Sequence, residues 1–403
     1  MELLTFLGTG NYNTTNYTWQ DQTKETPYVA EALAEFLKPN KIKIFVTSEA
    51  REKHSQAFLK RIDSSYDCTF VDIPSGQSET EIWQIFEAVV NAVNSDTEIS
   101  FDITHAFRSL PLLVLLAGAF LQKAKNVNIQ GVYYGAFEVN RDQPPIFDLT
   151  SAIKLLDWLT ATDKFLTTGS AVELGNLLTT IQGDFYKQNQ PQKGEARPTQ
   201  LKGFGDKILK FSQSLEYARA MDTLDDAGKI QQFSTERLSD EIGVFAKPFE
   251  LLLNPIQEQY GQFAVANSRE SDLKLVLEKQ FLLLRWYVSK QLGTQAILLA
   301  REWIVSAFCY LEKVDYLSRD ERGKIEQQLG KMIGLNRNFE QPIITFVQDA
   351  EVLSSTWSKL TEYRNDIAHC QMRETGIAAD NLGRYVKNNL LDDLSQLFPE
   401  LVI

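Results

Sequence analysis

The chain has 403 residues and a formal net charge of −12, with 43% hydrophobic and 11% aromatic residues. We expect two domains because this length exceeds what one hydrophobic core usually supports, and the composition excludes a disordered chain. The acidic charge argues against a protein that coats nucleic acid nonspecifically, because such proteins neutralise phosphates with a basic surface. A polyanionic ligand is therefore expected to lie in a local pocket.

Membrane, export and disulfide signals are weak in this sequence. The longest apolar stretch, LPLLVLLAGAFL at 110–121, is shorter than the roughly 18 residues that span a bilayer. The start MELLTFLGTG lacks the basic segment and cleavage site of a signal peptide, so we expect a strand there and a cytoplasmic protein. Cys68, Cys309 and Cys370 lie far apart in the chain, which argues against disulfides and structural zinc, and we expect no metal.

The first 150 residues alternate between two kinds of pattern. Short apolar or β-branched runs predict strands at 3–10, 41–48, 68–74, 98–104 and 128–138. Apolar residues at helical spacing predict helices between them at 27–37, 49–62, 79–93 and 110–124. Strands separated by single helices indicate a Rossmann-like α/β domain, with a parallel sheet and helices on both faces.

From residue 151 onward the strand signal disappears and apolar stripes of helical period follow, as in SAIKLLDWLTATDKFL. An all-α region is therefore expected after the α/β domain. The segment 183–205 is polar and rich in Gln, Gly and Pro, which predicts a mobile loop within the helical half.

Ligands of open α/β sheets bind beyond the carboxyl ends of the strands, so the loop after the first strand is a candidate site. Gly8 and Gly10 offer backbone amides to a phosphate, and Thr9, Asn11 and Asn13 offer polar side chains. A plain tight turn is the alternative interpretation, because the loop lacks the third glycine of a dinucleotide fingerprint.

The loop after the fourth predicted strand, DITHAFRSLP, places Thr104, His105 and Arg108 before a helix N-terminus, which favours a phosphate. The alternative is that Thr104 caps that helix and that Arg108 is merely exposed. Tyr133 and Tyr134 on the fifth strand can stack on bases or belong to the core. His54 is interpreted as a surface residue, because no partner lies at helical spacing from it.

The segment EYRNDIAHC carries Arg364, Asn365 and His369 near the C-terminal end of the sequence. RNA cleavage by the substrate 2′-OH requires a base for that hydroxyl and a cation for the developing phosphorane charge. Histidine titrates in the useful range and an arginine fork matches phosphate oxygens. The alternative is an ordinary solvated helix face. A nucleophilic role for Cys370 is disfavoured, because neighbouring helical residues point in different directions.

Helix geometry constrains this candidate site. Arg364 and His369 lie roughly 140° apart around an ideal helix, whereas Asn365 and His369 share one face. The helix must therefore end or bend here, or a second copy must supply part of the site across a two-fold axis. We accordingly expect a homodimer or a higher oligomer.

Three motifs resemble one family. FDITHAFRSLP and FLGTGNY are similar to the D-x-T-H-G motif and the first-strand loop of CRISPR-associated DxTHG proteins, and RNDIAH is similar to the R-x(4)-H motif of HEPN ribonucleases. The motif glycine is Ala106 here, which puts the loop shape or the ligand preference in doubt. The resemblance implies a CARF sensor domain over 1–150, a helical connector over 151–260 and a HEPN domain over 261–403.

What this resemblance implies is a metal-independent endoribonuclease of type III CRISPR defence that cleaves single-stranded RNA without a cofactor. Its activator would be a cyclic oligoadenylate, expected to be cyclic tetra-adenylate, made by the type III effector complex. The activator would lie at Gly8–Asn11, Thr104, His105 and Arg108, and Arg364, Asn365 and His369 would be catalytic. A nucleotide-sensing regulator or scaffold without nuclease activity is one alternative. Degradation of the ligand by the sensor domain itself, through Thr104 or His105, is a further hypothesis.

Overall fold

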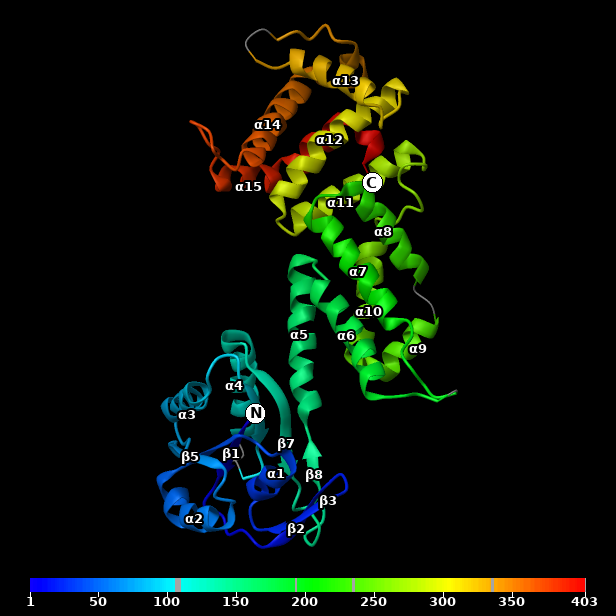
Figure 1. Ribbon diagram of the computed structural model, residues 1–403. Coiled ribbons are helices and arrows are strands. Elements are labelled where there is room, and N and C mark those ends of the chain that lie inside the picture. The colour runs from blue at the N-terminus through cyan, green and yellow to red at the C-terminus, as the bar shows by residue number, and fades with distance from the viewer. Residues whose placement is uncertain (106–109, 193, 234–235, 335–336, 403) are drawn as a thin grey trace. The chain divides into compact units, whose positions relative to one another are not determined.

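The computed structural model describes residues 1–105, 110–192, 194–233, 236–334 and 337–402. Within it the chain forms two compact units, Met1–Asp157 and Trp158–Ile403 (Figure 1). The first unit is α/β and the second is helical in its described part, so the predicted fold class and the order of its two parts are confirmed.

A six-stranded sheet forms the centre of the first unit, in the order β5-β4-β1-β6-β7-β8. Its strands are β1 (Glu2–Leu7), β4 (Lys41–Val46), β5 (Asp67–Asp72), β6 (Glu98–Asp102), β7 (Asn128–Gly135) and β8 (Ile146–Asp148). The first five are parallel, as predicted, and β8 adds an antiparallel edge strand that the sequence analysis missed. The carboxyl ends of β1 and β6 therefore lie side by side.

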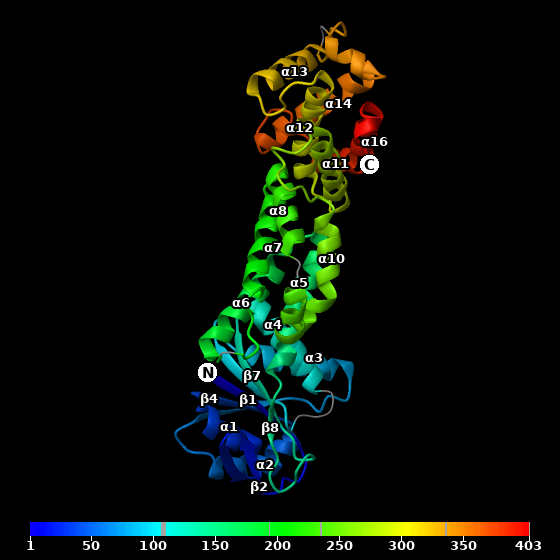
Figure 2. The same ribbon diagram turned by 90° about the vertical axis from the view of Figure 1, so that its right-hand side faces the viewer.

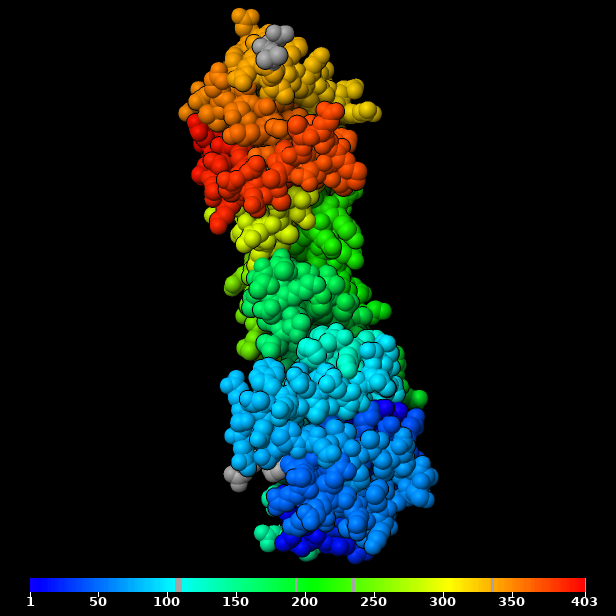
Figure 3. Space-filling model, turned by 90° about the vertical axis from the view of Figure 1, so that its left-hand side faces the viewer, coloured from blue at the N-terminus to red at the C-terminus, as the bar shows by residue number. Residues whose placement is uncertain are grey.

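Helices cover both faces of this sheet. Leu4 and Phe6 of β1 pack in one core with α3 (Glu79–Ala92) and α4 (Leu110–Lys125). Leu3 and Leu7 of the same strand pack in the other core, with α1 (Val29–Leu37) and α2 (Ser48–Arg61). Figure 3 shows the side of the unit on which α2 and α3 lie. Alternate residues of a buried strand thus fill two cores, which explains the uninterrupted apolar runs of the sequence.

A hairpin of β2 (Thr15–Trp19) and β3 (Gln22–Thr26) occupies the region between the first strand and the first helix. The sequence analysis treated 8–18 as a loop, and that was wrong from Thr15 onward. Both strands are largely polar, so they lack the apolar run from which a strand is predicted. Only Thr15, Tyr17 and Thr26 are buried, and the hairpin is held by pairing with itself and by Thr18, which bridges to Pro145.

The second unit, which begins at Trp158, is built from helices, and the first of them, α5, starts within the first unit. They are α5 (Thr150–Thr168), α6 (Val172–Gln188), α7 (Leu201–Glu216), α8 (Ala220–Phe233), α9 (Glu236–Phe245), α10 (Glu250–Gly261), α11 (Leu273–Ser289), α12 (Gly293–Glu312), α13 (Arg319–Lys331), α14 (Ala350–Ala368), α15 (Ala379–Asn388) and α16 (Leu390–Leu397). Short 3-10 turns lie at Lys247–Phe249, Pro342–Phe346 and Pro399–Leu401. Helices α6, α7 and α8 pack in succession, and α10 packs against α8 (Figures 1 and 2).

The predicted loop at 183–205 is shorter in the structure. Helix α6 continues to Gln188 and α7 begins at Leu201, so both ends of that segment are helical. Phe204 and Gly205 are buried in the packing of these two helices, which outweighs the polar composition of the segment. Among the described residues, no helix combines the length and apolarity that a bilayer span needs.

Gly169 directly follows the last residue of α5 and packs against the core of the helical unit. Its φ of +74° lies in the left-handed region, and its carbonyl accepts a hydrogen bond of 2.5 Å from the buried Tyr260 hydroxyl. A Cβ placed on Gly169 would overlap the indole of Trp286, which also lies in this core. Glycine is therefore required here for two independent reasons.

We expect Gly169→Ala to lower the free energy of unfolding of the helical unit by about 2–4 kcal/mol, because it combines backbone strain with overpacking. Gly183→Ala is the matched control, since nothing lies within 4 Å of that position in α6. The control should raise stability by about 0.5–1 kcal/mol. Urea unfolding followed by circular dichroism measures both, and equal effects would contradict this account.

Candidate functional site

Asp102 ends β6 and joins it to the neighbouring strand. Its side chain is fully buried, and Oδ2 accepts a hydrogen bond of 2.7 Å from Thr5 Oγ1 of β1. Oδ1 accepts bonds from the Thr104 hydroxyl at 2.6 Å and the Thr104 amide at 3.0 Å. Burial raises the pKa of this carboxyl, while the bonds from Thr104 and Thr5 oppose that shift.

Thr104 connects β6 to the next strand on the other side. While its hydroxyl donates to Asp102, it accepts a bond of 2.8 Å from the amide of Gly135 at the end of β7. The Thr104 side chain is thus hydrogen-bonded to groups at the ends of β6 and β7. It holds the start of the predicted ligand loop in place.

Tyr12 is the centre of the first-strand loop. Its hydroxyl accepts a bond of 2.8 Å from the Gly8 amide and donates one of 3.0 Å to the Gly8 carbonyl. Its ring lies between two histidines, with centroids 4.5 Å from His54 and 3.9 Å from His105. This three-ring stack brings together the 8–13 loop, α2 and the loop after β6.

The interpretation of His54 as a surface residue was wrong. Its side chain is only 6% exposed, Nε2 lies 2.9 Å from the Gly10 carbonyl, and Nδ1 lies 3.3 Å from the Tyr28 hydroxyl. No pattern in the sequence predicts this burial, because the partners of His54 come from other elements and not from its helical neighbours. The neighbouring Lys53 donates a bond of 2.6 Å to the Thr9 carbonyl, so α2 holds the glycine loop at two points.

His105 lies against the other face of Tyr12. Its Nε2 has no solvent contact and no hydrogen-bond partner among the described residues. Burial, and to a smaller extent the nearby His54, lowers the pKa of His105 to about 4. The imidazole is therefore neutral near pH 7, and its Nε2 is a buried polar atom without a partner among the described residues, in a side chain that lines the pocket described next.

A pocket of about 180 Å³ opens beside this stack. Its wall contains three of the predicted ligand residues, Asn11, Thr104 and His105. It also contains Asn13 and Tyr134, which the sequence patterns offered as further candidates, and residues that were not predicted, namely Tyr12, Tyr17, Pro27, Gly135, Phe137 and Glu138. The wall as described does not include Gly8, Thr9 or Gly10, which shape the loop through the contacts above. Arg108 and Ala106 lie outside the described residues.

The two candidate tyrosines of β7 have different surroundings. Tyr133 is buried and meets the Trp19 ring edge-on at 5.5 Å, so it belongs to the core. Tyr134 lines the pocket, and its hydroxyl donates a bond of 3.1 Å to Glu138. Successive side chains of a strand point to opposite faces, so the strand pattern could have predicted that only one of the two tyrosines lines the pocket.

The second predicted site lies where α14 ends. His369 is the residue after the helix, with its amide donating 3.1 Å to the Asn365 carbonyl, so the expected helix end at this motif is confirmed. Arg364 Nη1 donates a bond of 3.0 Å to Asn365 Oδ1, and the Arg364 and His369 side chains are exposed. The structure thus brings Arg364 and Asn365 into contact, and among the described residues no side-chain hydrogen bond joins either of them to His369.

Asp366 has a structural role that the sequence analysis did not assign. It is 6% exposed, and its Oδ1 accepts a hydrogen bond of 3.3 Å from the Ile377 amide. Its backbone carbonyl accepts a hydrogen bond of 2.9 Å from the Gln371 amide. Cys370 and Gln371 follow the helix with left-handed φ of 48° and 62°. The chain turns back at this point, and Asp366 holds the turn that presents His369.

The low pKa of His105 predicts a pH dependence of stability. Between pH 6.5 and about 4 the unfolded chain binds a proton at this residue and the folded chain does not, so the free energy of unfolding falls as pH falls. We expect His105→Phe, which keeps the stacking ring, to reduce this loss between pH 7 and 5 by on the order of 1–2 kcal/mol. Urea unfolding at both pH values measures it. An NMR titration midpoint near 6.5 for His105 would contradict the prediction.

Residues 3–138 match the family model described as the CRISPR system endoribonuclease Csx1, CARF domain. A CRISPR-associated protein of Methanocaldococcus jannaschii is 32% identical over 136 residues, which cover 32% of this chain and 21% of that protein. The chain thus spans about a fifth of the length of that relative. A solved structure, that of Enterococcus italicus Csm6 bound to cyclic hexa-2′-fluoro-hexa-dAMP, aligns over 99% of this chain and 94% of that chain. The sequence identity is 12% and the TM-score is 0.35, which is too low to support a structural argument. The α/β unit is therefore similar to the CARF domain of the CRISPR-associated Csx1 family, in agreement with the resemblance of its two loop motifs.

Proposed function

We propose that this protein is an endoribonuclease of type III CRISPR defence that cleaves single-stranded RNA when a cyclic oligoadenylate binds its α/β unit. The observation that carries the proposal is the exposed end of α14, where Arg364, Asn365 and His369 gather in a chain whose α/β unit matches a CARF domain. The division of the helical part into a connector (151–260) and a HEPN domain (261–403) is part of the proposal.

The chemistry assigns each of the three residues a role. His369 takes the proton from the substrate 2′-OH, which then attacks the adjacent phosphorus and breaks its bond to the 5′ oxygen. The 5′ oxygen takes a proton from water and leaves as a 5′-hydroxyl, and the other product is a 2′,3′-cyclic phosphate. Arg364 stabilises the charge that develops on the phosphorane oxygens. Asn365 holds the arginine fork in place through its 3.0 Å bond. These roles need no metal, so cleavage is proposed to be metal-independent.

The ligand is proposed to bind at the pocket beside Tyr12. Asn11 and Thr104 contribute polar groups, and His105 contributes a neutral ring nitrogen. The glycine loop (Gly8, Thr9 and Gly10) and Arg108 complete the proposed site. Cyclic tetra-adenylate is the proposed activator, and its rotational symmetry suits a pocket shared by two copies of the chain.

We expect RNA cleavage in EDTA to require cyclic tetra-adenylate, and His369→Ala or Arg364→Gln to lower the rate by about 10²–10⁴-fold because each removes a transition-state contact. The measurement is the release of labelled fragments from single-stranded RNA. Matched controls are Cys370→Ala and Arg373→Gln, two exposed neighbours outside the proposed chemistry.

Cleavage that survives His369→Ala, or that EDTA abolishes, would contradict this mechanism. The ligand-bound state must be checked in the same variants by titration with the cyclic adenylate. If the cyclic adenylate binds normally and neither the wild type nor any variant cleaves RNA, the chain is a sensing regulator or scaffold.

An exposed apolar row on α4 supports the proposed homodimer. Leu112, Leu116 and Phe120 lie four residues apart on one face and are 65%, 52% and 48% exposed. On α3, the 58% exposed Trp83 meets Phe86 at 5.8 Å, and Phe86 meets Phe120 at 5.5 Å. A contiguous apolar surface of this kind marks an interaction site.

We expect Leu116→Glu to convert the dimer into a monomer, because it places a charge in the centre of the apolar row. Light scattering after size exclusion measures the mass. Leu251→Glu is the control, since Leu251 is 84% exposed and belongs to α10, not to α3 or α4. An unchanged mass for Leu116→Glu would place the dimer contact elsewhere or exclude it.

A further inference from the structure

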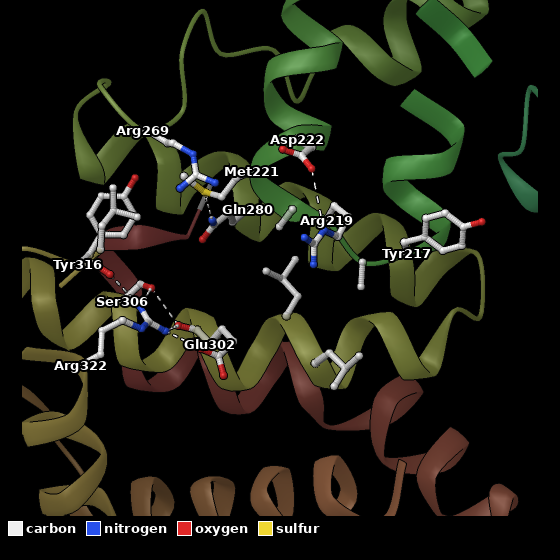
Figure 4. A pocket seen from close by; sticks show the side chains of 15 residues that line it. Tyr217, Arg219, Met221, Asp222, Arg269, Gln280, Glu302, Ser306, Tyr316 and Arg322 are labelled. Carbon is white, nitrogen blue, oxygen red and sulfur yellow. Dashed lines mark hydrogen bonds and ion pairs between the residues drawn. The ribbon is translucent and has the colours of Figure 1, made fainter. Parts of the chain in front are cut away.

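A second pocket lies in the helical unit, outside every motif discussed above (Figure 4). Its volume is about 540 Å³, which falls within the range of small-molecule sites. The α7–α8 turn, the loop before α11, helix α12 and the start of α13 form its walls. We name it the arginine pocket after Arg219, Arg269 and Arg322.

The three arginines differ in how far they are already engaged. Arg322 donates to Ser306 Oγ at 2.9 Å, the Tyr316 carbonyl at 3.1 Å and Glu302 Oε2 at 2.6 Å. Arg219 has only a loose ion pair with Asp222 at 4.0 Å, on the solvent side. Arg269 is exposed, and its guanidinium makes no ion pair with any described residue. Two guanidinium groups are therefore available to an anion.

The loop that carries Arg269 is held firmly by the preceding residue. Ser268 is fully buried, its amide donates a bond of 2.6 Å to Asp225 Oδ1, and its carbonyl accepts one of 2.9 Å from the Tyr316 hydroxyl. Arg219 is similarly fixed at its backbone, because its amide donates 2.8 Å to Ser214 and its carbonyl accepts 2.8 Å from Thr223. Both side chains thus start from rigid backbone, which lowers the entropy cost of binding.

The rest of the wall combines apolar side chains, a buried amide and two carboxylates, of which Glu302 is paired with Arg322 and Asp222 is the loose partner of Arg219. Met221, Leu298 and Leu299 provide the apolar surface. Gln280 is 7% exposed, and its only hydrogen bond among the described residues is a 3.4 Å contact from Nε2 to the thioether of Met221, a weak acceptor. Its carbonyl oxygen is free to accept a hydrogen bond from a ligand, and Figure 4 shows it beside Arg269.

We propose that the arginine pocket binds a phosphorylated nucleotide, with the phosphate held by Arg219 and Arg269. Arginine forks match phosphate oxygens in two-point contacts. The base lies on the leucines of α12, where the Gln280 amide can pair with its polar edge. Such a nucleotide is either free or the 5′-phosphorylated end of an RNA strand, because both present the same groups.

The test uses the full-length protein and AMP as the probe, with adenosine for comparison. We expect AMP to bind at least about tenfold more tightly than adenosine, and Arg269→Gln and Arg219→Gln each to weaken it by about tenfold. Arg197→Gln, an exposed arginine of the same unit that does not line the pocket, should leave binding unchanged. Calorimetry measures the affinities.

A second arm distinguishes the source of the nucleotide. A 2′-O-methyl hexanucleotide, which cannot be cleaved by 2′-OH attack, is titrated with and without a 5′ phosphate. Binding that needs this phosphate and both arginines, without AMP binding, assigns the pocket to a strand end. Failure of both probes at millimolar concentration, equal affinity for adenosine and AMP, or affinities unchanged in both arginine variants would overturn the proposal.

Discussion

The buried carboxylate of Asp102 is the constraint on which the ligand edge of the α/β unit depends. It receives hydrogen bonds from Thr5 of β1 and from Thr104, whose hydroxyl in turn accepts the Gly135 amide of β7. A carboxylate without these donors would be costly to bury, so the three strand ends and the carboxylate hold one another in place. The loop that begins at Thr104 therefore starts from a fixed point, and His105 is aimed at Tyr12.

The central strands β1 and β4 could be predicted because they are buried on both faces and are rich in apolar residues. The edge strand β5 is more exposed, and its aromatic and β-branched residues predicted it instead. The hairpin at Thr15–Trp19 and Gln22–Thr26 could not be predicted, since its stability lies in pairing between polar strands. The helical state of 183–188 was missed for a related reason, because polar side chains on an exposed face do not prevent a helix whose other face packs. In both cases contacts between elements decided the outcome, by strand pairing in the hairpin and by helix packing at 183–188, and local composition does not encode these contacts.

The candidate sites were predictable to the extent that topology brings residues together. Parallel strands place the loops after β1 and β6 at one edge, which is why Asn11, Thr104 and His105 meet in one pocket. The stack of Tyr12 between His54 and His105 is a matter of tertiary geometry, and no spacing in the sequence signals it. Similarly, helix period offers an end of α14 near His369 as one of the alternatives, but it does not predict that a buried Asp366 would hold the turn that follows.

Helix α12 lies between the arginine pocket and α14, so the two are in physical contact through one element. Glu302 faces Arg322 at 2.6 Å and Arg301 at 2.9 Å, and the Arg301 guanidinium lies 4.6 Å from the centre of the Trp357 ring on α14. Arg322 is bonded to three residues and is expected to remain with Glu302 when an anion binds, because Arg219 and Arg269 are less engaged. Occupation of the pocket should therefore leave this chain of contacts intact. A nucleotide there would add contacts to α12 without moving α14, which fits a site for holding a ligand better than a switch.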